Sequence, residues 1–303
     1  MAGSVTESRR ELVILPVHNE NNVYITKKNI KKILRKGGIE RDDIEHLELW
    51  QEAFVHESYC VRTDFVKNEK FYGRLDTNYN PELDEYKDIV PLQEKTSERL
   101  EWLGDGILQS VMANYLFRRY PNHQEGFLTK LRSRLVKTKT LSILSKELGL
   151  DRYIMISKHK EVIQNGRIDD RILEDAFEAL IGAMSLEFGR EDEMEGMRVC
   201  KDFIIHVYEA NINFTALINT DDNYKDQLMR YFHKTFDGYF PTYELKGVEM
   251  VEMDNGIQKR KFNIIVKNPG GEIVGEGVSF MKQDAEIKAA KAALNYYGIT
   301  DGY

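Results

Sequence analysis

Cysteine is scarce in this chain, and the long apolar runs that mark membrane proteins are missing. The 303 residues contain two cysteines, Cys60 and Cys200, too few and too far apart for a disulfide framework or a zinc site. No run of about 18 uncharged apolar residues occurs, and Met1–Arg10 has no apolar core of the kind that a secretion signal needs. These absences predict a cytoplasmic, intracellular protein with no membrane partner.

An excess of positive charge is also missing. The net charge is −7, which at first sight weighs against a nucleic-acid partner. The charges are unevenly distributed, however, because residues 223–298 contain 11 Lys and Arg against 10 Asp and Glu, so the acidic excess lies in the remainder. An acidic domain can still hold a phosphodiester where divalent cations cover its carboxylates. Charge by itself therefore excludes no substrate class.

The first two-thirds of the chain has the apolar periodicity of helices. Helical patterning covers 47–59 and, with interruptions, 93–210, whereas the period breaks down between 61 and 90 and predicts a loop or an insertion there. No strand pattern of comparable strength occurs between 93 and 210. We therefore expect an N-terminal extension over 1–45 and an all-α domain over 46–210.

The pattern changes after a polar stretch at 211–222, which predicts a linker. Two turn sequences, one at Asp254–Gly256 and one at Asn268–Gly271, separate runs with strand character. The expected elements are a helix over 224–235, strands over 242–251, 261–268 and 272–280, and an Ala-rich helix over 283–297. This α-β-β-β-α order predicts a small α+β domain over 223–298.

Two pairs of acidic residues lie on helical segments that are otherwise apolar. Glu101 and Asp105 are four residues apart and Asp175 and Glu178 three apart, so each pair shares one helix face, and Glu98 extends the first stripe. A single pair of this kind usually marks a solvated helix face. Two pairs inside apolar helices instead favour burial, and buried carboxylates need a partner. Oxygen ligands without nearby Cys or His suit Mg²⁺ or Mn²⁺.

The residues around these acids resemble the ribonuclease III family. The run ERLEWLGD at Glu98–Asp105 resembles the hallmark motif of that family, with tryptophan where phenylalanine is usual. The run DAFEALIG at Asp175–Gly182 resembles its second catalytic segment. Residues Ala53–Tyr59 and Glu125–Arg132 are similar to two further family segments, in the family's order. The resemblance spans about four-fifths of the chain.

The resemblance implies a double-strand-specific endoribonuclease with a helical catalytic domain that forms a homodimer. It implies cleavage to 5′-phosphate and 3′-hydroxyl ends with short 3′ overhangs, Mg²⁺ as cofactor with Mn²⁺ as a substitute, and no organic cofactor. Four acids would bind the metal and form the catalytic cluster, namely Glu101, Asp105, Asp175 and Glu178. Two further acids, Glu98 and Glu125, would lie near this site. His56 would have a structural role.

The C-terminal segment resembles a double-stranded RNA-binding domain. Such domains recognise the shape of A-form RNA through 2′-hydroxyls and phosphates. By resemblance, the RNA contacts would come from Arg230 and His233 in the first helix and from Lys282 and Lys288 in the last. Gln283 stands where a second basic residue is usual, so we expect weaker or differently oriented binding than in a typical member.

Two questions remain open from the residues alone. Glu174 stands beside Asp175 where the family usually has a small residue, and it either perturbs the site or faces solvent. The alternative function is a non-catalytic protein that binds and sequesters double-stranded RNA. All four acids are present, which favours the enzyme.

Overall fold

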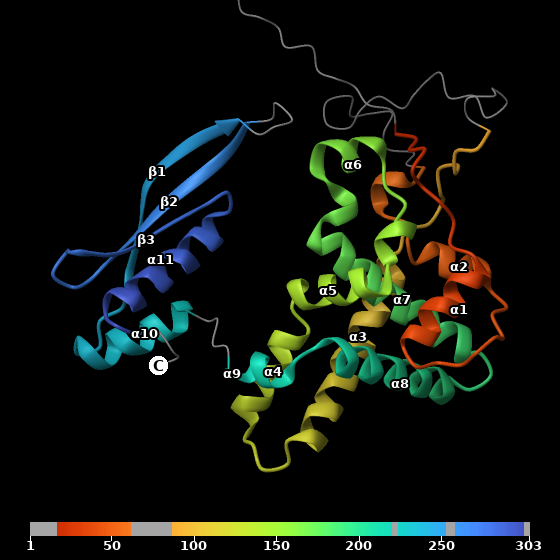
Figure 1. Ribbon diagram of the computed structural model, residues 1–303, viewed down its shortest axis with the longest axis horizontal. Helices are drawn as coiled ribbons and strands as arrows, with labels where there is room; N and C mark the ends of the chain where they lie inside the picture. Colours follow the sequence, from red (N-terminus) through yellow and green to blue (C-terminus); the bar gives the residue numbers. More distant parts are fainter. Residues whose placement is uncertain (1–16, 62–86, 220–223, 253–257, 300–303) are drawn as a thin grey trace, which may run out of the picture. The chain divides into compact units, whose positions relative to one another are not determined.

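A computed structural model describes residues 17–61, 87–219, 224–252 and 258–299 (Figure 1). The chain divides into two compact units between Ile212 and Asn213. Most of the insertion expected at 61–90 lies outside the described residues. No helix within them is long and apolar enough to cross a membrane.

The first unit is helical, and α7 (Asp170–Phe188) lies in its centre. Most residues of α7 are buried, and it packs against α2, α3, α5 and α8. The remaining helices of the first unit are α1 (Lys27–Lys36), α2 (Leu47–Glu52), α3 (Glu98–Arg119), α4 (Glu125–Leu135), α5 (Thr138–Leu148), α6 (Lys158–Gln164) and α8 (Glu193–Asn211). The all-α expectation for this unit is confirmed. A further helix, α9 (Phe214–Asn219), lies within the stretch expected to be a linker.

Residues 17–45 pack into the helical unit. Thr26 caps α1 by accepting a hydrogen bond from the amide of Asn29, and the Ile30, Ile33 and Leu34 side chains of α1 are buried. The carboxylate of Glu187, in α7, accepts hydrogen bonds from the backbone amide of Glu45 and from the indole of Trp50. Residues 17–45, which the sequence assigned to an extension, thus contribute to the same core.

The helix expected over 47–59 is shorter than predicted. It ends at Glu52, and Val55 then pairs with Met155 in an isolated parallel bridge. The Met155 amide donates to the Phe54 carbonyl at 2.8 Å, and the His56 amide donates to the Met155 carbonyl at 3.0 Å. Backbone groups committed to this bridge cannot also complete helical hydrogen bonds. A 3₁₀ turn at Glu57–Tyr59 follows.

The second unit has the expected helix–sheet–helix order. Its antiparallel sheet has the strand order β1-β2-β3, and its core forms where the two long helices pack on one face (Figure 1). Gly275 and Gly277 of β3 allow α11 to approach closely, because a Cβ at either position would lie within 2.3 Å of a carbonyl oxygen of α11. The elements are α10 (Tyr224–Thr235), β1 (Thr242–Glu252), β2 (Gln258–Lys267), β3 (Ile273–Ser279) and α11 (Lys282–Tyr296).

Candidate active site

The two acid-bearing helices touch through their backbones. At Gly104 in α3, an added Cβ would lie 1.8 Å from the carbonyl oxygen of Glu178, and at Gly182 in α7 it would lie 2.1 Å from the carbonyl oxygen of Leu100. Real Cβ atoms do not approach oxygen so closely, so no side chain fits at either position. The two glycines therefore set the separation of α3 and α7.

The acids flank this crossing. On α3, Glu101 directly follows Leu100 and Asp105 directly follows Gly104, the two residues whose backbones touch α7. On α7, the backbone of Glu178 touches α3, and Asp175 precedes Glu178 by about one turn. Glu178 is only 8% exposed, and Asp175, Glu101 and Asp105 are half-buried. The crossing thus removes the acids partly from water while bringing pairs from two helices to one place.

Burial and mutual repulsion disfavour the ionised acids. Burial raises the pKa of Glu178 to about 8, assisted by the charges of Asp105, Glu174, Glu101 and Asp175. It raises the pKa of Asp175 to about 7, with Glu101 next in effect. The pKa of Glu101 is raised as well, by burial and then by Glu98. The electrostatic field of this cluster therefore attracts positive charge.

A pocket opens beside the crossing. Acidic side chains from three parts of the chain line it, namely Glu98 and Glu101 of α3, Asp175 of α7 and Glu57 of the 3₁₀ turn. Ser97, Phe54 and His56 contribute to its wall. The lining does not include Asp105, whose carboxylate accepts a hydrogen bond from Gln109 at 3.1 Å, or Glu178.

Glu125, expected near the site, is absent from the pocket lining. It begins α4, is exposed, and accepts a hydrogen bond from the Thr129 hydroxyl at 2.7 Å. Its place near the catalytic acids stays a prediction. His56 accepts a hydrogen bond from the Ser58 amide through Nδ1 and so caps the 3₁₀ turn, which agrees with a structural role.

The donor chemistry of the cluster fits a divalent cation. As the side chains lie, no three acidic, histidine or cysteine groups within the described ranges converge closely enough to hold a metal ion. Carboxylates are hard oxygen donors, as Mg²⁺ prefers. Asp and Glu side chains also turn about single bonds, so the acids can close on an ion without any change in the helix crossing. Burial and neighbouring acids raise the pKa of Asp175 and of Glu178, so a bound cation would favour the ionised form of both side chains.

One feature of the site was not recognised from the sequence, and a second was left undecided. Gly104 and Gly182 were assigned no role of their own from the sequence. Glycine inside a helix lowers helix stability by about 1 kcal/mol relative to alanine, so its presence there indicates a close packing contact. Glu174 does not simply face solvent: it is half-buried, burial raises its pKa, and its charge helps to raise the pKa of Glu101, Asp175 and Glu178.

The expected RNA-binding residues lie on the two helices of the second unit. Arg230 and His233 are exposed on α10, and Arg230 forms an ion pair with Asp226 at 3.1 Å. Lys282 is the exposed first residue of α11. Lys288 donates to the carbonyl of Val278 at 3.0 Å, so its ammonium is held against the end of β3. Their contacts with RNA stay predictions.

The chain matches two protein families and many individual relatives. Residues 98–189 match the ribonuclease III domain, and residues 224–297 match the double-stranded RNA binding motif. A probable ribonuclease 3 of Acanthamoeba polyphaga mimivirus is 39% identical over 70% of this chain, and the match covers 36% of that relative. Ribonuclease 3 of Clostridium perfringens is 34% identical over 71% of this chain and 82% of its own length.

Among solved structures, the nuclease domain of ribonuclease III from Campylobacter jejuni is 27% identical, with a TM-score of 0.43, over 60% of this chain and 98% of that domain. The family assignment rests on the sequence matches, which cover both units in the same order. This chain belongs to the ribonuclease III family, with a double-stranded RNA binding motif after its nuclease domain.

Proposed function

We propose that this ribonuclease III family member is a metal-dependent enzyme that hydrolyses both strands of duplex RNA. The products would have 5′-phosphate and 3′-hydroxyl ends with short 3′ overhangs. The observation that carries the proposal is the backbone contact at Gly104 and Gly182, which holds two acid pairs at one half-buried place. The double-stranded RNA binding motif supplies the substrate class, because such a unit recognises A-form shape.

Four residues would hold the cation: Glu101 and Asp105 from α3, and Asp175 and Glu178 from α7. A bound Mg²⁺ supplies an acidified water and neutralises charge on the phosphate and the leaving 3′ oxygen. The chain's own contribution is to hold acids from two helices at a fixed separation and to shield them partly from solvent. Partial burial strengthens their electrostatic interactions with an ion. Glu178 would release a proton on binding the ion, because its pKa of about 8 favours the neutral form near pH 7. Asp175, whose pKa is about 7, would release one only from its protonated fraction.

The metal dependence is tested with a long RNA duplex labelled at its 5′ ends. We expect shortening in Mg²⁺, none in EDTA, and recovery when Mg²⁺ is restored in excess. Enzymatic analysis of the fragments should find 5′-phosphates and 3′-hydroxyls. Retention of the duplex without cleavage in Mg²⁺ would instead identify a sequestering protein, and 2′,3′-cyclic phosphate ends would exclude the proposed chemistry.

A homodimer is the second part of the proposal. Trp102 projects from α3 with 80% of its surface exposed, an unusual position for the largest apolar side chain. A groove in the same unit is lined by apolar residues of four helices: Leu49, Leu103, Ile107, Leu186 and Met197. A two-fold axis would let Trp102 of each copy enter this groove on the other. Each copy would then cut one strand.

Trp102→Ala should weaken this dimer. A buried tryptophan anchor contributes about 2 kcal/mol or more to association, so we expect the dissociation constant to rise about 30-fold or more. Light scattering across a concentration series measures the change, with Ile168→Ala as the matched control, because Ile168 is also an exposed apolar residue, at 65%. Unchanged dimerisation of Trp102→Ala would contradict the proposed interface.

A further inference from the structure

A short segment before α1 is bound to the nuclease unit through buried polar side chains. Residues 17–22, called the strap below, lie beside residues 154–158, and the Lys158 amide donates to the Val17 carbonyl at 3.3 Å. Asn19 is fully buried and Asn22 is 2% exposed. Amides are seldom buried so completely, and buried ones need specific hydrogen-bond partners.

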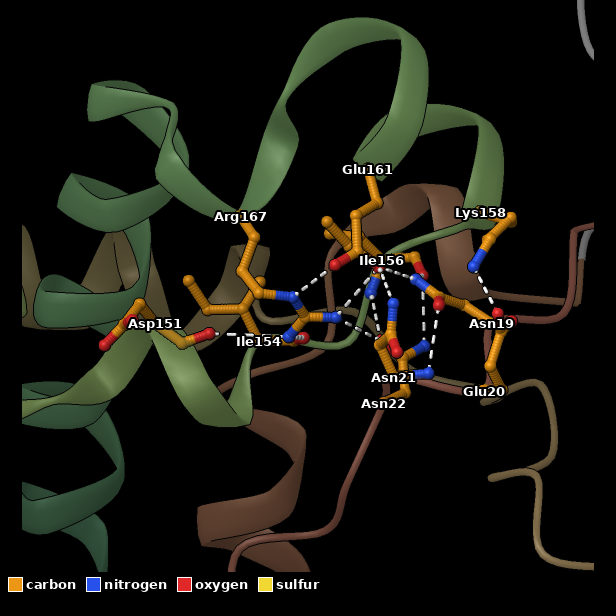
Figure 2. Close-up of polar contacts among 10 residues, drawn as sticks. All are labelled: Asn19, Glu20, Asn21, Asn22, Asp151, Ile154, Ile156, Lys158, Glu161 and Arg167. Atoms are coloured by element: carbon orange, nitrogen blue, oxygen red, sulfur yellow. Dashed lines mark hydrogen bonds and ion pairs between the residues drawn. The ribbon is translucent and has the colours of Figure 1, made fainter.

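Asn22 pairs with Ile156 as a backbone strand would. Its Nδ2 donates to the Ile156 carbonyl at 3.0 Å, and its Oδ1 accepts from the Ile156 amide at 3.2 Å (Figure 2). Asn19 Nδ2 donates to the same carbonyl at 3.0 Å. The strap therefore satisfies both backbone groups of one residue in the middle of the 154–158 segment.

An ion pair holds the asparagines in place. Arg167 donates to Asn22 Oδ1 at 3.0 Å, to the Ile154 carbonyl at 2.7 Å and to Glu161 at 2.9 Å, while Asn19 also donates to Glu161 (Figure 2). These bonds lower the pKa of Glu161 to about 2, although burial opposes them. The carboxylate thus stays ionised, and the asparagine orientations are fixed by charged partners.

The opposite edge of the 154–158 segment holds the wall of the acidic pocket. Met155 pairs with Phe54 and His56 through the two backbone bonds of the isolated bridge, and the Val55 carbonyl accepts from the Ser97 amide at 2.9 Å. Phe54, His56 and Ser97 line the pocket. Ser97 directly precedes α3. A series of hydrogen bonds therefore runs from the asparagine side chains of the strap, through backbone groups, to the start of the helix that carries Glu101.

We infer that Asn19 and Asn22 are positioning residues for the catalytic site. Their hydrogen bonds to the Ile156 backbone fix the 154–158 segment on one edge. The other edge of that segment forms the Val55–Met155 bridge, which positions the pocket wall and the N-terminus of α3. Geometry at a reacting centre is sensitive to small displacements, since a shift of about 1 Å caused far from the chemistry can lower a rate about 100-fold. The inference rests on the proposed cleavage, and it assigns a role to residues outside the matched domain, which begins at residue 98.

Asn22→Ala tests this role, with Asn21→Ala as the control from the same strap. Asn21 is exposed, and its side chain makes one long contact with Glu161, at 3.4 Å. For Asn22→Ala we expect single-turnover cleavage about 10-fold to 100-fold slower, duplex affinity in EDTA within about twofold of wild type, and faster hydrogen exchange at the Met155 and His56 amides. Asn21→Ala should match wild type in all three measurements.

The outcomes separate this inference from the function on which it rests. If wild type fails to cut duplex RNA in Mg²⁺, the proposed function fails, and the exchange measurement still decides whether the strap holds the bridge. If Asn22→Ala cuts at the wild-type rate, or slows cutting without faster exchange at Met155 and His56, the positioning role is wrong. Should Asn22→Ala not fold, Asn19→Ala, which leaves the Asn22 pair intact, is judged by the same criteria with a smaller expected effect.

Discussion

Glu178→Gln is expected to slow cleavage of duplex RNA about 1000-fold while leaving RNA binding in EDTA unchanged. Loss of one group that stabilises charge at a reacting centre costs about 100-fold to 1000-fold, and this acid is the most buried of the four. Glutamine keeps the size of the side chain but cannot hold a cation by charge. Single-turnover kinetics at saturating enzyme, together with a filter-binding titration, measure the two quantities separately.

The same variant has an expected effect on stability that depends on pH. Because the pKa of Glu178 is raised from 4.5 to about 8 in the folded protein, the stability of metal-free wild type falls as pH increases between these values. A neutral glutamine avoids this loss, so the melting temperature of Glu178→Gln should exceed that of wild type at pH 8.5. A lower melting temperature at that pH would contradict the repulsion described for the site.

Glu187→Gln provides the matched control. Glu187 lies on the same helix and is buried to a similar extent, at 7% exposed, but it binds Trp50 and the backbone of Glu45 instead of facing other acids. Its substitution should lower the melting temperature and leave the cleavage rate of the folded fraction unchanged. If Glu178→Gln cut RNA as fast as this control, Glu178 would have no catalytic role.

Gly104→Ala should have the second large effect. Its Cβ would lie 1.8 Å from the Glu178 carbonyl oxygen, and only separation of α3 from α7 relieves that clash. We expect a loss of about 2 kcal/mol of stability, typical of overpacking in a core, and cleavage at least about 100-fold slower because the acid pairs move apart. Chemical denaturation and single-turnover cleavage measure these effects.

Gly106→Ala is the control on the same helix. An added Cβ there has nothing within 4 Å, and alanine is favoured over glycine in a helix by about 1 kcal/mol. This variant should be as active as wild type and slightly more stable. Wild-type activity in Gly104→Ala would show that the helix separation does not set the geometry of the acids.

The sequence predicts the local parts of this protein well. Spacings of three and four residues place each acid pair on one helix face without any knowledge of the tertiary fold. The β runs and turns of the second unit are equally local signals, and the structure confirms its α-β-β-β-α order. The predicted helix over 47–59 is wrong in its second half because Val55 pairs with Met155, a partner one hundred residues away that no local pattern reveals.

The strap and Glu174 show the same limit. Asn19 and Asn22 look like surface residues in a polar stretch, and only the backbone of Ile156 explains their burial. Glu174 could equally have faced solvent, and its influence on Glu101 depends on how α3 and α7 cross. Residues whose role is set by contacts between distant segments are therefore the ones that the sequence leaves undecided.

The central claim is that acids from α3 and α7 bind one divalent ion together. Anomalous diffraction from crystals of the protein soaked in Mn²⁺ tests it most directly. We predict a peak at about 2.2 Å, the distance of direct coordination by oxygen, from at least one acid of Glu101 and Asp105 and from at least one of Asp175 and Glu178. A peak coordinated by one helix alone, or no peak between the two helices, would contradict the claim.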